Sequence, residues 1–169
     1  MATSLPVYHI DTYVLLPSND EQNIIARRVM KGAESKYILK VSVLALGECL
    51  LKILTDNRFK EDIMEDDGVR RSRPLTRIEE LIEEDIVQIC SPRDDWHQYI
   101  EGIKGCGDNQ LRYKHPTDIS LISIAMTEEA NGFITADRDI LRSRNLKSYV
   151  AGVCPGLEIL DAEDAPNFR

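Results

Sequence analysis

The segment at residues 115–141 constrains the fold more than any other part of this chain. Thr117 stands at a position where its hydroxyl could cap a helix. We expect Asn131-Gly132 to end that helix, because glycine readily adopts the left-handed conformation found at many helix ends. Between them, apolar residues recur at the spacing of one helix face, at Ile119, Ile122, Ala125 and Met126. The segment therefore predicts a helix over about 118–130.

A short strand and two carboxylates belong to the same segment. Residues 133–136 read as a strand that leads directly into Asp137, while Asp118 shares the predicted helix face with Ile122 and Ala125. A carboxylate on an apolar face costs free energy unless it has a partner. Helix starts and strand ends gather at the carboxyl edge of an open α/β sheet. The two carboxylates therefore predict a cation site at that edge.

Strands and helices alternate along the whole chain. Strand-like stretches occupy 7–10, 37–41, 86–90, 147–153 and 157–160, and helical patterns fill about 20–31, 43–54, 77–84 and 94–103. This alternation predicts an α/β fold, a three-layer α/β/α arrangement with a mostly parallel central sheet. The 169 residues suit a single domain over 1–169. We expect a charge-rich insertion at about 56–76, a solvated helix extension and a loop broken at Gly68 and Pro74, and a frayed tail from about 161.

Composition excludes some classes of function. A net charge of −8 argues against a protein that coats nucleic acid by bulk charge, although a local basic groove is compatible with it. The four cysteines have neither a CxxC pair nor the spacing of a zinc site, which favours reduced thiols in a cytoplasmic protein. A signal peptide and an apolar run of about 20 residues are both lacking, so we expect no membrane association.

Two further carboxylates occupy equivalent positions. Asp11 follows the strand at 7–10, and Glu48 lies early in the helix that Ser42 should cap. Glu48 shares a helix face with Leu44 and Leu51, which predicts an inward orientation. No Lys or Arg stands at these motif positions, so we expect the acidic set to be without a neutralising partner.

The predicted sheet brings these carboxylates to one rim, with Asp139 as a fifth candidate: Asp11, Glu48, Asp118 and Asp137. Several carboxylates without nitrogen or sulfur ligands favour Mg²⁺ or Mn²⁺ over zinc. Such ions polarise phosphoryl oxygens and lower the pKa of bound water. The pattern therefore indicates metal-dependent phosphate chemistry.

Simpler interpretations of the same residues stay open. Asp11 could cap a turn, and Asp118 could serve only the helix dipole. Glu48 could face solvent if its helix is rotated by one position, and Asp137 with Asp139 could form an ordinary acidic turn. Arg138 and Arg142 lie beside the predicted site and are candidates for phosphate contacts. Three other arginines, at 70, 71 and 73, could do the same but are better explained as a solvated loop.

The chain resembles the PIN-domain ribonuclease family over roughly residues 5–160. Four pieces carry the resemblance, in the family's order: Asp11-Thr12 after a hydrophobic strand, the segment SVLALGE from Ser42 to Glu48, Thr117-Asp118-Ile119 at a helix start, and Thr135-Ala136-Asp137-Arg138-Asp139 after a short strand. The insertion at 56–76 makes the distance from Glu48 to Asp118 longer than in small toxin-type members.

The resemblance implies an endoribonuclease that uses Mg²⁺ or Mn²⁺. Asp11, Asp118 and Asp137 would be the main metal ligands, and Glu48 would bind a second ion or orient a water. Asp139 would belong to the outer shell or a second ion. Thr135 would hydrogen-bond a ligand carboxylate or the attacking water. In-line attack by water would leave a 5′-phosphate and a 3′-hydroxyl on the RNA.

Partners follow from the same resemblance. Many members are toxins paired with a small antitoxin, others process RNA, and many PIN-like domains form homodimers. The helix with Trp96 and Tyr99 offers aromatic surface for such a dimer, or belongs to the core. The alternative function is a non-catalytic PIN-like module that binds RNA or protein. A phosphatase of the haloacid dehalogenase type would have an Asp two residues after Asp11, where Tyr13 stands.

Overall fold

Five parallel strands form the centre of the structure, in the order β5-β2-β1-β6-β7. The computed structural model describes residues 4–106 and 116–167. The strands are β1 (Val7–Ile10), β2 (Ile38–Ser42), β5 (Val87–Cys90), β6 (Gly132–Thr135) and β7 (Glu158–Asp161). The predicted α/β fold with a parallel central sheet is confirmed.

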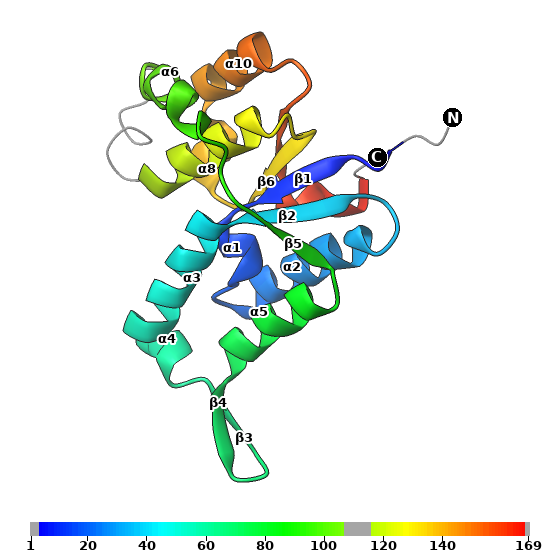
Figure 1. Ribbon diagram of the computed structural model, residues 1–169, viewed down its shortest axis with the longest axis vertical. Coiled ribbons are helices and arrows are strands. Elements are labelled where there is room, and N and C mark those ends of the chain that lie inside the picture. The colour runs from blue at the N-terminus through cyan, green and yellow to red at the C-terminus, as the bar shows by residue number, and fades with distance from the viewer. Residues whose placement is uncertain (1–3, 107–115, 168–169) are drawn as a thin grey trace.

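Helices cover both faces of this sheet. Figure 1 shows α6, α8 and α10 on one side and α1, α2 and α5 on the other. Their bounds are α1 Thr12–Leu15, α2 Asp20–Ala33, α3 Val43–Thr55, α4 Asn57–Lys60, α5 Arg73–Glu83, α6 Ile100–Lys104, α8 Pro116–Thr127, α9 Arg138–Arg142 and α10 Arg144–Val153, with 3₁₀ helices at Trp96–Tyr99 and Ala162–Asn167. No helix in the described ranges is long and apolar enough to cross a membrane.

Helix α8 is the most deeply buried helix, and its ends differ from those predicted. It already includes Pro116, so Thr117 is not its cap, and residue 115 lies outside the described residues. It ends at Thr127, where Glu129 takes the left-handed conformation with φ of 54°. The Ala130 amide donates to the carbonyl of Ala125, and the Glu129 amide to that of Met126, which is the hydrogen-bond pattern of a Schellman cap.

Gly132 therefore has a different role from the one we expected. It begins β6, and a Cβ there would lie 2.7 Å from Cδ1 of Leu160 and 2.9 Å from Cδ1 of Tyr8. Gly132 does not end the helix. Its missing side chain instead allows the neighbouring strands β1 and β7 to pack closely against β6.

The insertion is ordered, and the expectation of a loop there is wrong. Strands β3 (Ile63–Asp66) and β4 (Val69–Ser72) pair antiparallel in a hairpin that projects from the body (Figure 1). Asp67 and Gly68 have φ of 49° and 76°, as a two-residue type I′ turn requires. Pro74 lies in the first turn of α5, where its missing amide hydrogen costs nothing.

Two predictions near the C-terminus are also wrong. Residues 147–153 belong to helix α10, which buries Leu146 and Val150 at a spacing of four. The region after 161 forms a 3₁₀ helix against α2, with Ala162 and Ala165 buried. The Tyr149-Val150 pair and Val153 favour a strand locally, whereas the 3₁₀ helix carries few apolar residues.

Candidate functional site

The register of the central strands brings the first two residues of the site together. Ile10 pairs with Ile134, so Asp11 and Thr135 follow side by side at the strand ends. The Thr135 hydroxyl donates a short hydrogen bond to Oδ2 of Asp11, and the amide of Val14 donates to Oδ1 over 3.0 Å. Asp11 thus caps α1 while fully buried. Burial raises the pKa of Asp11 to about 6, although the two hydrogen bonds favour the ionised carboxylate and lower the pKa.

Asp118 lies in the first turn of α8 and is 8% exposed. Its pKa is raised to about 7, first by burial and then by the negative charges of Asp11, Asp137 and Glu48. Asp118 is therefore near enough to Asp11, Asp137 and Glu48 for their charges to act on it.

Glu48 is held by two neighbours. The Thr12 hydroxyl donates to its Oε2 over 2.7 Å, and the Lys52 ammonium lies 2.9 Å from its Oε1. Lys52 also lies over the ring of Tyr13, 4.8 Å from the centroid. The expectation of an acidic set without a cationic neighbour is wrong, because Lys52 reaches Glu48 from one helical turn away.

The orientation of α3 also differs from our expectation. Its buried residues are Ala45, Cys49 and Ile53, whereas Leu44 and Leu51 are 37% and 60% exposed. Glu48 consequently lies at the margin of the buried face rather than among inward-facing leucines. The apolar pattern of α3 is strong on two sides, and the sequence cannot tell which of them packs on the sheet.

Asp137 caps the helix that follows β6. Its Oδ1 accepts hydrogen bonds from the amides of Asp139 and Ile140 over 2.7 and 3.3 Å, and its own amide donates to the Thr135 hydroxyl oxygen. Asp139 lies in the first turn of that helix, α9. Thr135 thus connects Asp11 to Asp137.

The two arginines predicted to contact phosphate differ in their surroundings. Arg138 forms ion pairs with Asp161, over 2.9 Å, and with Glu163. Arg142 is exposed in the last turn of α9. A hollow of about 270 Å³ opens beside this helix, and Tyr13, Gln22 and Asp137 help to line it.

The donor atoms suit a hard divalent cation, because all of them are carboxylate oxygens. Asp11 and Asp118 are buried, and burial together with the charges of neighbouring carboxylates raises the pKa of both. Within the described part of the chain, however, no three His, Cys, Asp or Glu side chains are arranged to hold a metal ion. Three of the carboxylates instead accept hydrogen bonds from protein donors.

Lys52, Thr12 and Tyr13 had no role assigned from the sequence. Thr12 follows Asp11 directly, and Lys52 stands four residues after Glu48, so their positions relative to the carboxylates were the available signal. Tyr13 carried no such signal, since only the packing of α1 on α3 brings its ring under Lys52.

The comparison with solved structures bears on the fold. The structure is similar to VapBC2 from Rickettsia felis, solved bound to a DNA fragment from their promoter, with a TM-score of 0.57 and 12% identity. The match covers 92% of this chain and 98% of that chain. The fold is PIN-like. No family model matches the sequence, and no curated protein matches it significantly.

Proposed function

We propose that this protein is a Mg²⁺- or Mn²⁺-dependent endoribonuclease. The observation that carries the proposal is Asp118, a buried carboxylate whose pKa is raised by three further carboxylates at the carboxyl edge of a PIN-like sheet. Such a group is stabilised by a proton or a cation. Near neutral pH a divalent ion would serve, because it neutralises several carboxylates at once.

Each residue has a part in this proposal. Asp11, Asp118 and Asp137 would hold the cation, with Glu48 and Asp139 beside them. When bound, the ion would polarise a phosphoryl oxygen and lower the pKa of the attacking water. Thr135 orients Asp11, and Thr12 orients Glu48. Lys52 adds a fixed positive charge, which favours the charge that develops on the phosphoryl group.

The test is cleavage of a single-stranded RNA by the purified protein with Mg²⁺, with Mn²⁺ and with EDTA. We expect cleavage only with a divalent ion, and its loss in Asp118→Asn combined with Asp137→Asn. Cleavage that persists in EDTA or in the double variant would contradict the proposal.

A protein partner is the second part of the proposal. Helix α3 exposes a row of large aliphatic side chains, which we call the α3 surface: Val43, Leu44, Leu50, Leu51 and Leu54. Large contiguous apolar patches on soluble monomers often mark sites of protein–protein interaction. The resemblance to PIN-domain toxins that pair with a small antitoxin, together with the likeness to VapBC2 bound to a DNA fragment from their promoter, supports an antitoxin as the partner, with a second copy of this chain as the alternative. Trp96 is half-buried against the core, so it offers less surface for either contact.

A non-catalytic module is the alternative function. The hydrogen bonds that already occupy Asp11, Glu48 and Asp137 favour it, because capping and ion pairing explain these residues without a metal. The cleavage assay separates the two functions.

A further inference from the structure

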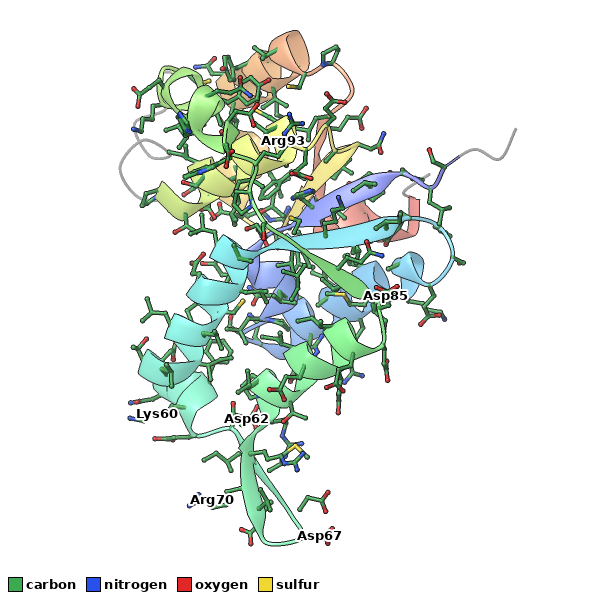
Figure 2. The ribbon with its side chains drawn as sticks, in the orientation of Figure 1. Lys60, Asp62, Asp67, Arg70, Asp85 and Arg93 are labelled. Carbon is green, nitrogen blue, oxygen red and sulfur yellow. The ribbon has the colours of Figure 1, made fainter. Side chains whose placement is uncertain are left out.

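A cleft of about 600 Å³ lies on the sheet face that carries α1, α2 and α5. The segment joining α1 to α2 forms one wall, and α4, the base of the hairpin and the start of α5 complete it. Figure 2 shows Asp62 at the base of the hairpin, whereas Asp67 and Arg70 lie far out along it.

The cleft is basic although the protein is acidic. Four arginines line it, Arg27, Arg58, Arg73 and Arg77, and the acidic residues among its lining are the two aspartates at 20 and 62. Its formal charge is therefore positive by two, in a chain with a net charge of −8. Such a local concentration of one charge in a concave surface attracts ligands of the opposite sign.

Two of the arginines are neutralised by carboxylates. Arg58 pairs with Asp56 over 2.5 Å, and Arg73 pairs with Asp62 over 3.0 Å. Their charges are therefore largely satisfied within the protein.

Arg27 and Arg77 are different. Arg77 is half-buried, and its Nη1 donates to the side-chain oxygen of Asn23 over 2.8 Å, a neutral acceptor. Neither arginine has an ion pair with any carboxylate in the described parts of the chain. Burial and then the charge of Arg27 lower the pKa of the Arg77 guanidinium. Two like charges thus line the same cleft, and an anion bound beside both would relieve their repulsion.

The cleft adjoins the acidic edge through one segment of chain. Tyr13 and Gln22 line the hollow beside Asp137, and residues 15–20 with Asn23 line the cleft. Gln22 and Asn23 are consecutive residues of α2, so a ligand could pass from one depression to the other around the start of that helix.

We propose that Arg27 and Arg77 bind the phosphodiester backbone of an RNA strand whose neighbouring part lies at the acidic edge. This inference rests on the proposed function and adds a substrate contact to it. Arginine suits the site because its planar fork of donors matches two phosphate oxygens. An extended polyanion is favoured over a small anion because the arginines that line the cleft come from α2, α4 and α5, so the positive charge is spread along the cleft.

The test measures RNA binding without cleavage. A fluorescent single-stranded RNA of about 12 nucleotides is titrated in EDTA, and binding is followed by anisotropy at several salt concentrations. Arg27→Gln should weaken binding about 5- to 10-fold and reduce the slope of log K against log salt by about 0.7, the value for one phosphate contact on a single strand. Arg28→Gln is the matched control, because Arg28 is the next residue of α2, is exposed and does not line the cleft.

Arg77 needs a milder change because it is half-buried. Arg77→Lys keeps the positive charge but removes the planar pair of guanidinium donors. It should weaken RNA binding with little change in the slope of log K against log salt. Its melting temperature, compared with the wild type, shows whether the fold is intact. If it is not, Arg27→Gln carries the test alone.

The outcomes separate this inference from the nuclease proposal. Equal binding by Arg27→Gln and Arg28→Gln would overturn the inference even if the protein cleaves RNA. Binding that depends on Arg27 would support it even if no cleavage is found. Competition identifies the ligand. Inorganic phosphate, a mononucleotide and polyglutamate are each added at a phosphate or carboxylate concentration equal to the phosphate concentration of the RNA. Displacement of the RNA by any of them would overturn a site specific for a nucleic-acid strand.

Discussion

The ammonium of Lys52 lies 2.9 Å from Oε1 of Glu48 and 4.8 Å from the ring centroid of Tyr13. Burial and the neighbouring carboxylates raise the pKa of Asp118, and the positive charge of Lys52 partly offsets this rise. Lys52 therefore acts as a resident cation at the edge where we propose a divalent ion. Its effect on ion binding follows from Coulomb's law, since a fixed positive charge opposes the arrival of another.

We predict that Lys52→Gln binds Mn²⁺ more tightly than the wild type. Removing the ammonium leaves Glu48 with the Thr12 hydroxyl as its donor, so the edge becomes more negative. The stability cost should be small, about 0–1 kcal/mol, because the ion pair is partly exposed. The measurement is the Mn²⁺ concentration that gives half of the thermal stabilisation. Lys104→Gln removes an exposed lysine that pairs with Glu101, away from the site, and should leave this midpoint unchanged.

The metal-free protein should lose stability as pH rises from about 4 to about 7. Asp11 and Asp118 have pKa values of about 6 and 7 in the folded state, above about 3.9 in the unfolded chain. The folded state then binds more protons in this range, and stability falls with rising pH. The stability that protonation of Asp11 and Asp118 contributes is complete below about pH 4. It is lost as pH rises through their folded-state pKa values of about 6 and 7.

Asp118→Asn isolates this effect. In EDTA at pH 7.5 it should melt several degrees above the wild type, because one pKa unit corresponds to about 1.4 kcal/mol and each kcal/mol to about 2–4 °C. The difference should shrink at pH 5. Added Mn²⁺ should stabilise the wild type by about 2.7 kcal/mol at a hundredfold excess over its dissociation constant, and the variant by less. A pH-independent difference, or equal responses to Mn²⁺, would contradict the interpretation.

Thr135→Val should destabilise the protein by about 1–3 kcal/mol, because buried Asp11 loses the donor to its Oδ2. The pKa of Asp11 should then rise further, so the cost should be larger at pH 7.5 than at pH 5. Urea unfolding at both values measures it. Thr127→Val provides the control, since that buried hydroxyl bonds only to backbone carbonyls and its loss should cost the same at either pH.

Charges on the α3 surface should prevent protein association without harming the fold. Leu51 and Leu54 are 60% and 70% exposed, so Leu51→Lys with Leu54→Lys should change the free energy of unfolding by less than about 1 kcal/mol. We expect the wild type to associate at micromolar concentration, with itself or with an antitoxin co-expressed from the same operon, and the double variant to stay monomeric in light scattering. A wild type that is monomeric and copurifies with no partner would argue against this surface as an interface.

Local sequence patterns were sufficient for the five strands of the sheet, although they also predicted a strand at 147–153 that is helical, and for most of the acidic edge. The hydrophobic strands, the cap at Ser42 and the carboxylates near the strand ends were all visible, because each depends on residues near one another in the chain. Alternating strands and helices then required a parallel sheet, which gathers strand ends at one edge. The positions of Asp11, Asp118 and Asp137 follow from that rule alone.

Tertiary structure decided the rest, wherever a residue's surroundings come from distant parts of the chain. The inward face of α3, the ring of Tyr13 beneath Lys52 and the presence of Arg27 and Arg77 in one cleft depend on how separate helices pack. Packing also decided the ends of α8, since Gly132 was needed where β6 meets its neighbours and Glu129 took the left-handed position instead. Sequence periodicity shows that a helix has an apolar side, but only the contacts with the sheet determine which side is buried and which charges meet.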